Sequence, residues 1–206
     1  MLLVINPDNP QKRYIDQVVK ILEDGGVIIY PTDTVYGIGC DIYNNKAVEK
    51  ICRLRGLDPV KARLSFICSD IAQISEYAQQ IDNETFKLMK RNLPGPFTFV
   101  LKSNNKVPKM FKNRKRTIGV RIPDNNIVQD LVSALGRPIL TASLKSDDEI
   151  LEYFTDAYDI HEDLGNQVEV VIDGGAASNQ PSTVVDCTES GNDPEILRQG
   201  AGELRY

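Results

Sequence analysis

A group of polar side chains follows the apolar run Val27–Tyr30. The next segment, Pro31–Gly37, reads PTDTVYG and supplies two threonine hydroxyls, a carboxylate and a phenol before a glycine that permits close approach to the backbone. Groups of this kind at the carboxyl end of a strand suit the binding of a small polar ligand. An ordinary turn at the end of a strand is the other interpretation, and the residues alone leave both open.

A second candidate segment, TIGVRIP, ends in an arginine. If it is a strand, Thr117, Gly119 and Arg121 share one face, and the apolar residues between them share the other. Thr117 and Arg121 would then project into the same site, with Gly119 leaving room between them. A salt-bridged arginine on the surface is the alternative.

Two further segments combine turns, hydroxyls and a cation. Pro94–Phe99 begins with a rigid P-G-P turn, which we interpret as architectural. Pro181–Asp186 brings a hydroxyl pair into an apolar strand, and Arg198 stands in a later one. Both segments could be structural, but a single arginine in an acidic tail indicates a specific anionic partner.

Helix and strand patterns alternate along the chain and would position these groups. A helix is expected to begin at Asp8–Pro10, with further helices over 46–55, 70–78, 83–92, 125–135 and the acidic stretch 147–164. Strands are expected at 27–30, 64–68, 97–102, 117–122 and 138–144, and at VEVVI, STVVD and EILR. This mixture predicts an α/β fold, with residues 1–206 forming a single domain.

The formal net charge of −5 conceals a polarised distribution. Residues 87–121 hold eleven Lys or Arg and no Asp or Glu. A basic cluster within them would neutralise several RNA phosphates, and it consists of Lys109, Lys112, Arg114, Lys115 and Arg116. The alternative is a solvated loop that contributes to solubility.

Several classes of protein are disfavoured. Neither standard glycine-rich phosphate loop is present. The four cysteines form no C-x-x-C pair and His161 is the only histidine, so we expect no protein-bound metal. No apolar run approaches the roughly 20 residues that cross a bilayer, and the first residues carry no basic leader. We therefore expect a cytoplasmic protein with no membrane partner.

The order of the motifs carries more information than any one of them. PTDTVYG, PGPFT, VRIP, PSTVVD and LRQG follow one another as in the YrdC/YciO family, and the resemblance covers about residues 8–202. The best-known members of that family are L-threonylcarbamoyladenylate synthases. The resemblance implies a YrdC-like domain with a twisted mixed β-sheet, flanking helices and a large positively charged concave cleft.

The resemblance also implies a nucleotidyltransferase reaction. ATP, L-threonine and bicarbonate would give threonylcarbamoyl-AMP and pyrophosphate for the modification of tRNA. ATP would act as a substrate, with Mg²⁺ carried by its phosphates. By the same resemblance the threonine site would consist of Thr34, Arg121, Thr141 and Ser182. The nucleotide and phosphate site would consist of Arg55, Lys61, Arg63, Thr117, Ser143, Lys145 and Arg198.

The chain departs from the synthase pattern in two motifs and at Ile67, where synthases usually have a histidine. Where synthases show K-x-R and S-x-N, this chain reads Arg55-Gly56-Leu57 and Ser143-Leu144-Lys145. Lys61 and Arg63 could restore the missing charge from nearby. These changes indicate the YciO-like branch, with altered activity on the same adenylate. The alternative function is a protein that binds tRNA or double-stranded RNA without synthase activity.

Overall fold

One sheet runs through the whole molecule. The computed structural model describes residues 1–57, 64–109, 116–145, 152–189 and 193–206. The strands in these residues are β1 (Leu2–Val4), β2 (Ile28–Tyr30), β3 (Gly37–Asp41), β4 (Ser65–Ile67), β5 (Phe97–Lys102), β6 (Thr117–Arg121), β7 (Ile139–Ser143), β8 (Val170–Asp173), β9 (Thr183–Asp186) and β10 (Glu195–Arg198).

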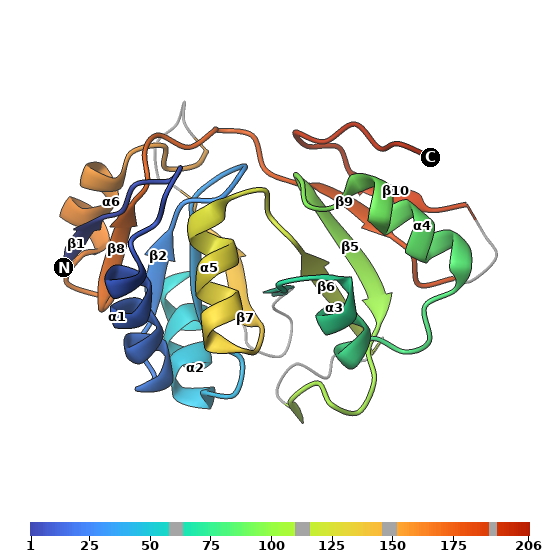
Figure 1. The fold of residues 1–206 in the computed structure, drawn as a ribbon, viewed down its shortest axis with the longest axis horizontal. Helices are drawn as coiled ribbons and strands as arrows, with labels where there is room; N and C mark the ends of the chain where they lie inside the picture. Colours follow the sequence, from blue (N-terminus) through green and yellow to red (C-terminus); the bar gives the residue numbers. More distant parts are fainter. Residues whose placement is uncertain (58–63, 110–115, 146–151, 190–192) are drawn as a thin grey trace.

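The sheet mixes parallel and antiparallel neighbours. Its strand order is β1-β8-β2-β3-β7-β4-β6-β5-β9-β10 (Figure 1). The pairs β1/β8, β2/β8, β4/β6 and β5/β9 are parallel. The other neighbouring pairs are antiparallel. The expected α/β fold with a mixed sheet is therefore confirmed.

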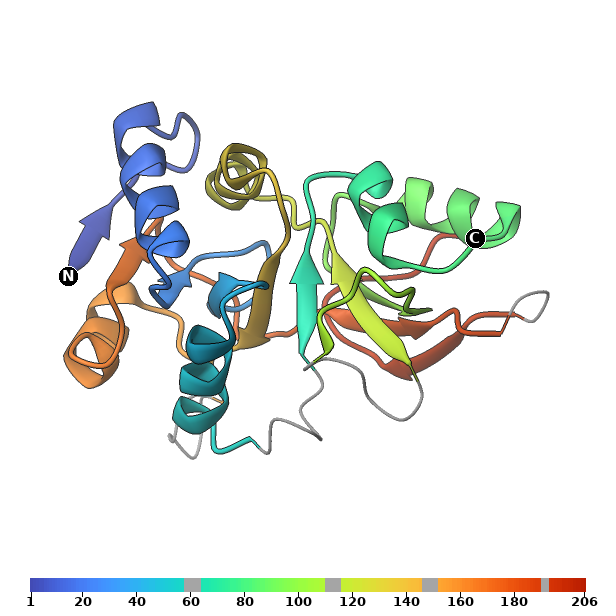
Figure 2. The same ribbon diagram turned by 90° about the horizontal axis from the view of Figure 1, so that it is seen from below.

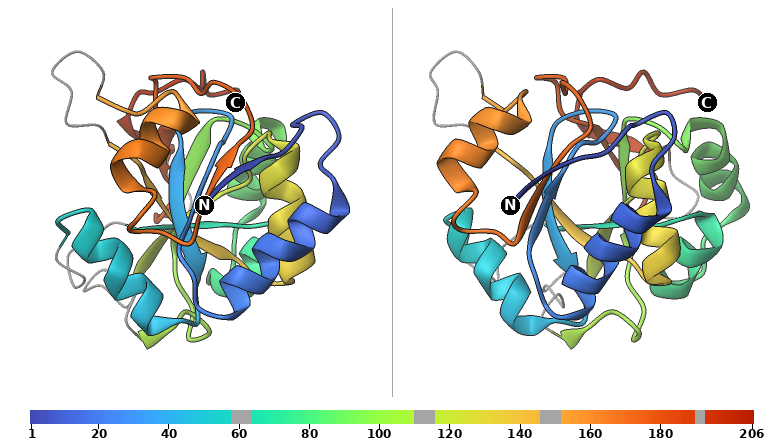
Figure 3. Two further views of the ribbon diagram at one scale, coloured as in Figure 1. Left: turned by 90° about the vertical axis from the view of Figure 1, so that its left-hand side faces the viewer. Right: turned by 60° about the vertical axis from the view of Figure 1, so that its left-hand side comes forward.

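The helices flank this sheet on both faces. They are α1 (Lys12–Glu23), α2 (Asn45–Leu54), α3 (Ile71–Tyr77), α4 (Asn83–Asn92), α5 (Asn126–Leu135) and α6 (Ala157–Leu164). Figures 2 and 3 show α1 beside α5 on one face of the strands that include β2 and β3, and α2 and α6 on the opposite face. None of the helices in the described residues is long and apolar enough to cross a membrane.

Alternation along the strands divides the apolar core in two. Ile28, Tyr30, Ile67 and Ile139 pack with the buried side chains of α1 and α5. Residues of opposite parity, such as Phe66, join the second cluster with α2, α3, α4 and α6. Because successive strand residues point to opposite faces, both faces can be buried at once.

Local signals place most helix ends where the sequence predicts them. The Asn125 side chain accepts a hydrogen bond from Val128 N at the start of α5, and Gly136 ends the helix in the left-handed region with φ 69°. Asp82 caps α4 in the same way, by accepting from Thr85 N.

Two expectations about elements are wrong, and two strands were not predicted. Helix α1 begins at Lys12 after Gln11, which makes no side-chain cap, and Asp8 instead belongs to a separate turn in which Asn6 Oδ1 accepts from Asp8 N. In the acidic stretch the helix begins only after Asp156, whose side chain caps it, and residues 146–151 lie outside the described residues. The strands β1 and β3 were not predicted: β1 has only three residues, and the β3 sequence GIGCD carries two glycines.

The end of the chain is held to β9 by one buried hydroxyl. Thr183 Oγ1 donates to Gly202 O at 2.7 Å and accepts from Gly200 N at 2.9 Å and Gly202 N at 3.1 Å. Thr183 is fully buried. The C-terminal segment therefore depends on the residue that follows Ser182 in the chain.

We expect Thr183→Val to lower the free energy of unfolding by about 2–4 kcal/mol, because it leaves buried backbone groups without their partner. Thr183→Ser is the matched control, since it loses a methyl group but keeps the hydroxyl. Urea denaturation should rank the wild type above T183S and T183S above T183V. A T183V protein as stable as T183S would show that the hydroxyl has no such role.

Candidate functional site

The register of the central strands brings small residues into one row. Gly119 of β6 lies opposite Ser65 of β4, Ser65 lies opposite Thr141 of β7, and Thr141 lies opposite Gly39 of β3. Residues that face each other in a sheet project from the same side. A Cβ on Gly119 would lie 2.6 Å from Ser65 Oγ, so this row leaves no room for larger side chains.

The predicted PTDTVYG segment forms a turn that is held by its own hydroxyls. Thr32 Oγ1 donates to Val35 O at 2.7 Å and accepts from Thr34 N at 3.1 Å. The hydroxyls of Thr32 and Thr34 lie 3.1 Å apart, and both residues are buried. The segment is therefore a turn at the end of a strand, and this turn fixes the direction of the Thr34 hydroxyl.

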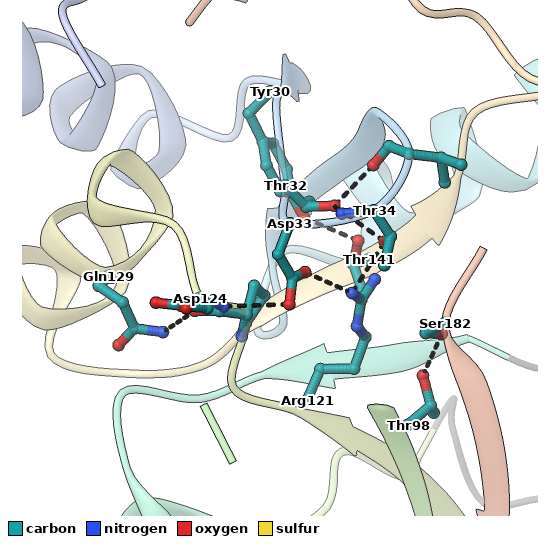
Figure 4. A network of polar contacts seen from close by, with 12 residues as sticks. Tyr30, Thr32, Asp33, Thr34, Thr98, Arg121, Asp124, Gln129, Thr141 and Ser182 are labelled. Atoms are coloured by element: carbon teal, nitrogen blue, oxygen red, sulfur yellow. Dashed lines mark hydrogen bonds and ion pairs between the residues drawn. The ribbon is translucent and has the colours of Figure 1, made fainter. Parts of the chain in front are cut away.

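Arg121 reaches this turn from β6 and makes two contacts with it. One terminal nitrogen, Nη2, lies 3.0 Å from Asp33 Oδ1 and 3.0 Å from Thr34 Oγ1. The other carboxylate oxygen, Asp33 Oδ2, accepts from Asp124 N at 3.1 Å (Figure 4). The ion pair is buried, with 7% of the Arg121 side chain and 8% of the Asp33 side chain exposed. Arg121 is thus salt-bridged, but it is not a surface residue.

Burial dominates the electrostatics of this pair. Removal from water lowers the pKa of Arg121, although the Asp33 charge opposes the change. Burial likewise raises the pKa of Asp33, against the effect of Arg121. The Arg121 Nε atom is also buried and has no hydrogen-bond partner. A buried donor without an acceptor is costly and calls for an explanation, which a bound anion would provide.

A second polar group lies across from Arg121. The hydroxyls of Thr98 in β5 and Ser182 are 2.8 Å apart. Arg198 Nε and Nη2 donate to Ser182 O at 3.2 Å and 2.7 Å. The positive charge of Arg198 contributes to lowering the pKa of Arg121, so the two guanidinium groups are close enough to repel each other.

Thr141 of β7 lies in the same region and is hydrogen-bonded to a buried tyrosine. Tyr30 Oη donates to Thr141 Oγ1 at 2.7 Å, and burial raises the pKa of the Tyr30 phenol. A Cβ at Gly39 would lie 2.9 Å from the Tyr30 ring, and one at Gly37 would lie 3.2 Å from it. The glycines of β3 therefore make room for the ring.

The remaining predicted nucleotide residues are spread more widely. Thr117 shares the face of Gly119 on β6, and Ser143 pairs with Gly37. Lys145 Nζ lies 2.8 Å from Glu152 Oε1 and 5.8 Å from the centre of the Tyr153 ring. Arg55 caps the C-terminal end of α2. Lys61 and Arg63 lie outside the described residues.

The predicted basic cluster is only partly visible. Lys109 and Arg116 are exposed, whereas Lys112, Arg114 and Lys115 lie outside the described residues. The positively charged concave cleft remains a prediction.

Sequence reasoning missed the partners of the predicted site residues. Asp33 was noted only as a carboxylate in the turn, and Thr98 was not singled out. The alternation in FTFVLK could have placed Thr98 on a polar face, because its neighbours Phe97 and Phe99 are apolar. No sequence pattern indicated that Asp33 and Arg121, 88 positions apart, would form an ion pair.

Comparison with known proteins connects this site to a family. The Sua5/YciO/YrdC family model, described as telomere recombination, matches residues 20–200. The chain is 42% identical to the uncharacterized protein YciO of Escherichia coli K12 over 203 residues, which cover 98% of this chain and 96% of that protein. The crystal structure of E. coli YciO matches with a TM-score of 0.90 at 40% identity, covering 98% of this chain and 97% of that one.

Two proteins named for the synthase reaction or bound to an amino acid also match. The threonylcarbamoyl-AMP synthase of Vibrio campbellii is 31% identical over 191 residues, covering 91% of this chain and all of that protein. The crystal structure of Pyrococcus abyssi Sua5 complexed with L-threonine matches with a TM-score of 0.85 at 29% identity, covering 97% of this chain and 57% of that one.

We expect Arg121 and Asp33 to be strongly coupled. Arg121→Met should destabilise the fold by roughly 3–5 kcal/mol at neutral pH, because it leaves a buried carboxylate without its partner. The double variant R121M/D33N should be more stable than R121M, since it removes that charge as well. Urea denaturation of the wild type, both single variants and the double variant gives the coupling energy.

The dependence of stability on pH tests whether the uncompensated Asp33 carboxylate causes the loss of stability in R121M. Without Arg121, the folded-state pKa of Asp33 rises further above its unfolded value, so the folded protein binds a proton more tightly. Relative to the wild type, R121M should therefore recover stability as the pH falls from 7.5 to 5. R121M/D33N should show no such recovery, and an equal recovery in both variants would rule out the uncompensated carboxylate as the cause.

Proposed function

The chain belongs to the Sua5/YciO/YrdC family, and on this premise we propose that it binds L-threonine and ATP. With bicarbonate, these substrates would give threonylcarbamoyl-AMP and pyrophosphate, or the chain would act on this adenylate as a YciO-type variant. The homology to threonylcarbamoyl-AMP synthases of about 30% identity supports the proposal.

The observation that carries the proposal is the buried Arg121 with its free Nε donor. Arginine suits carboxylates because its planar group donates several hydrogen bonds in fixed directions. Thr34 Oγ1, 3.0 Å from Arg121 Nη2, lies at the same end of the site. Together these groups would hold the carboxylate of L-threonine, and the hydroxyls of Thr141 and Ser182 would line the same region.

The nucleotide would lie toward Arg198. Its guanidinium is held on Ser182 O, and the predicted residues Thr117, Ser143 and Lys145 supply hydroxyls and a cation. In this proposal Mg²⁺ arrives on the ATP phosphates, and the chain contributes position and charge. The groups would bring a carbamate formed from threonine and bicarbonate close to the α-phosphorus, from which pyrophosphate leaves.

The nucleotide end is also where the chain departs from the synthase pattern. Lys145, at the S-x-N position, is paired with Glu152, so part of its charge is already offset. Leu57 replaces an arginine of the K-x-R pattern. A missing charge at a site of this kind can cost on the order of 10²–10³ in rate, which favours an altered activity over an efficient synthase.

Incubation with ATP, bicarbonate and radiolabelled L-threonine tests the proposal. We expect labelled threonylcarbamoyl-AMP, or hydrolysis of that adenylate when it is added. Arg121→Lys should reduce the rate on the order of 10²-fold, because lysine cannot reproduce the directed donors. Arg137→Lys is the matched control, since Arg137 pairs with Asp41 at the far end of β3. Neither formation nor hydrolysis at high protein concentration would rule the function out.

RNA binding is a second candidate. Lys102 and Thr117 face each other where β5 meets β6, and Lys102 and Arg116 are exposed at this end of the pair. Lys109 is exposed as well. Exposed cations of this kind bind phosphates without reading bases, and the family's product is destined for RNA. We therefore propose tRNA or double-stranded RNA as a partner of this end.

Affinity for RNA should fall steeply as salt rises, because bound cations release counterions from the phosphates. Arg116→Glu should weaken binding and reduce that slope. Arg13→Glu is the control, since Arg13 is an exposed cation on α1. Filter binding of tRNA from low to high salt measures both effects. Equal losses in R116E and R13E would leave only non-specific attraction.

A further inference from the structure

The Arg121–Asp33 pair has a consequence for which anions can bind. The arginine is the cation expected to receive a ligand, yet a carboxylate lies 3.0 Å from its Nη2 atom. Both side chains are buried, so water screens their charges poorly. At longer range the two opposite charges largely cancel, so the pair attracts an anion only weakly. A ligand is then held mainly by directed hydrogen bonds from the guanidinium.

Asp33 is also held in place from a second side. Its Oδ2 accepts from Asp124 N at 3.1 Å, so the carboxylate joins the turn after β2 to the loop before α5. Pro123 O of that loop accepts in turn from Gln129 Nε2 of α5 at 3.0 Å. Asp33 is therefore fixed, and a ligand that displaced it would lose contacts on two loops.

The donors of Arg121 besides Nη2 are Nε and Nη1, and they point in fixed directions from one planar group. Nη2 of Arg121 is occupied by Asp33 and Thr34, whereas Nε is buried without a partner. An acceptor bonded to Nε would lie within about 6 Å of the Asp33 carboxylate, given ordinary hydrogen-bond lengths. Every negative charge on the ligand therefore meets a fixed negative charge close by.

We propose that Asp33 is a specificity-determining and positioning residue, which fixes the Arg121 guanidinium and restricts its site to monocarboxylates by repelling dianionic phosphate groups. This inference rests on the proposed function, in which Arg121 receives the threonine carboxylate. It adds a reason why the same arginine does not capture a phosphate of ATP. Phosphates are then left to the end of the site with Arg198, whose Nε and Nη2 donate to the neutral carbonyl oxygen of Ser182.

Charge arithmetic gives the size of the effect. Repulsion by Asp33 grows in proportion to the charge of the ligand. Removing the Asp33 charge should therefore improve dianion binding by roughly the square of the factor by which it improves monoanion binding. If acetate gains about threefold, inorganic phosphate near pH 7.5 should gain about tenfold.

The Arg121 Nε–H group itself provides the measurement. Its burial slows exchange with water, so its ¹⁵N–¹H signal can be followed by NMR and assigned from its loss in Arg121→Lys. The full chain is titrated with acetate, L-threonine and inorganic phosphate in the wild type, Asp33→Asn and Asp33→Glu. D33N keeps an oxygen near Arg121 but removes the charge, whereas D33E keeps the charge.

In the wild type and D33E, acetate and L-threonine should shift the signal at concentrations at least tenfold below those needed for phosphate. In D33N, the ratio of phosphate to acetate affinity should rise at least threefold. A ratio that stays the same in folded D33N would overturn the inference. So would phosphate binding to wild-type Arg121 as tightly as acetate, which needs no variant.

The same titrations separate this inference from the proposed function. A signal that responds to acetate and discriminates against phosphate, but ignores L-threonine, would overturn threonine binding and support the role of Asp33. A signal that responds to L-threonine and to phosphate at equal concentrations would support threonine binding and overturn the role of Asp33. No response to any of the three anions would overturn both.

Discussion

The buried ion pair between Arg121 and Asp33 is the interaction on which the rest of the site depends. It joins the end of β6 to the turn after β2, two segments that the chain separates by 88 positions. Burial of both groups is unfavourable by itself, as the lowered pKa of Arg121 and the raised pKa of Asp33 show. Such a pair contributes little net stability, so its persistence is better explained by what it positions.

The sheet makes this pair possible by keeping its surroundings small. Gly119 and Ser65 lie side by side on β6 and β4, so no large side chain stands between Arg121 and the turn that carries Thr34. On the other side, β5 and β9 are parallel neighbours, which brings Thr98 and Ser182 together. The site is therefore assembled from strands that are distant in sequence, and strand register sets its dimensions.

Sequence patterns predicted the elements better than the contacts. Periodicity located α4, α5 and β5 closely, because their apolar residues and caps are local signals. The strand β3 was not predicted, because glycines are unfavourable in strands. Only the packing of the Tyr30 ring against them explains why they occur here. The role of the Thr98 hydroxyl was also missed. Its partner Ser182 is 84 positions away, and only the order of the strands brings the two residues together.

The two ends of the site differ in how completely they are built. At the end with Arg121, Nη2 is held by Asp33 and Thr34, whereas the buried Nε has no hydrogen-bond partner. At the other end, Lys145 is paired with the exposed Glu152. In the proposed function, this difference would leave the binding of the small substrate intact and alter the chemistry at the nucleotide.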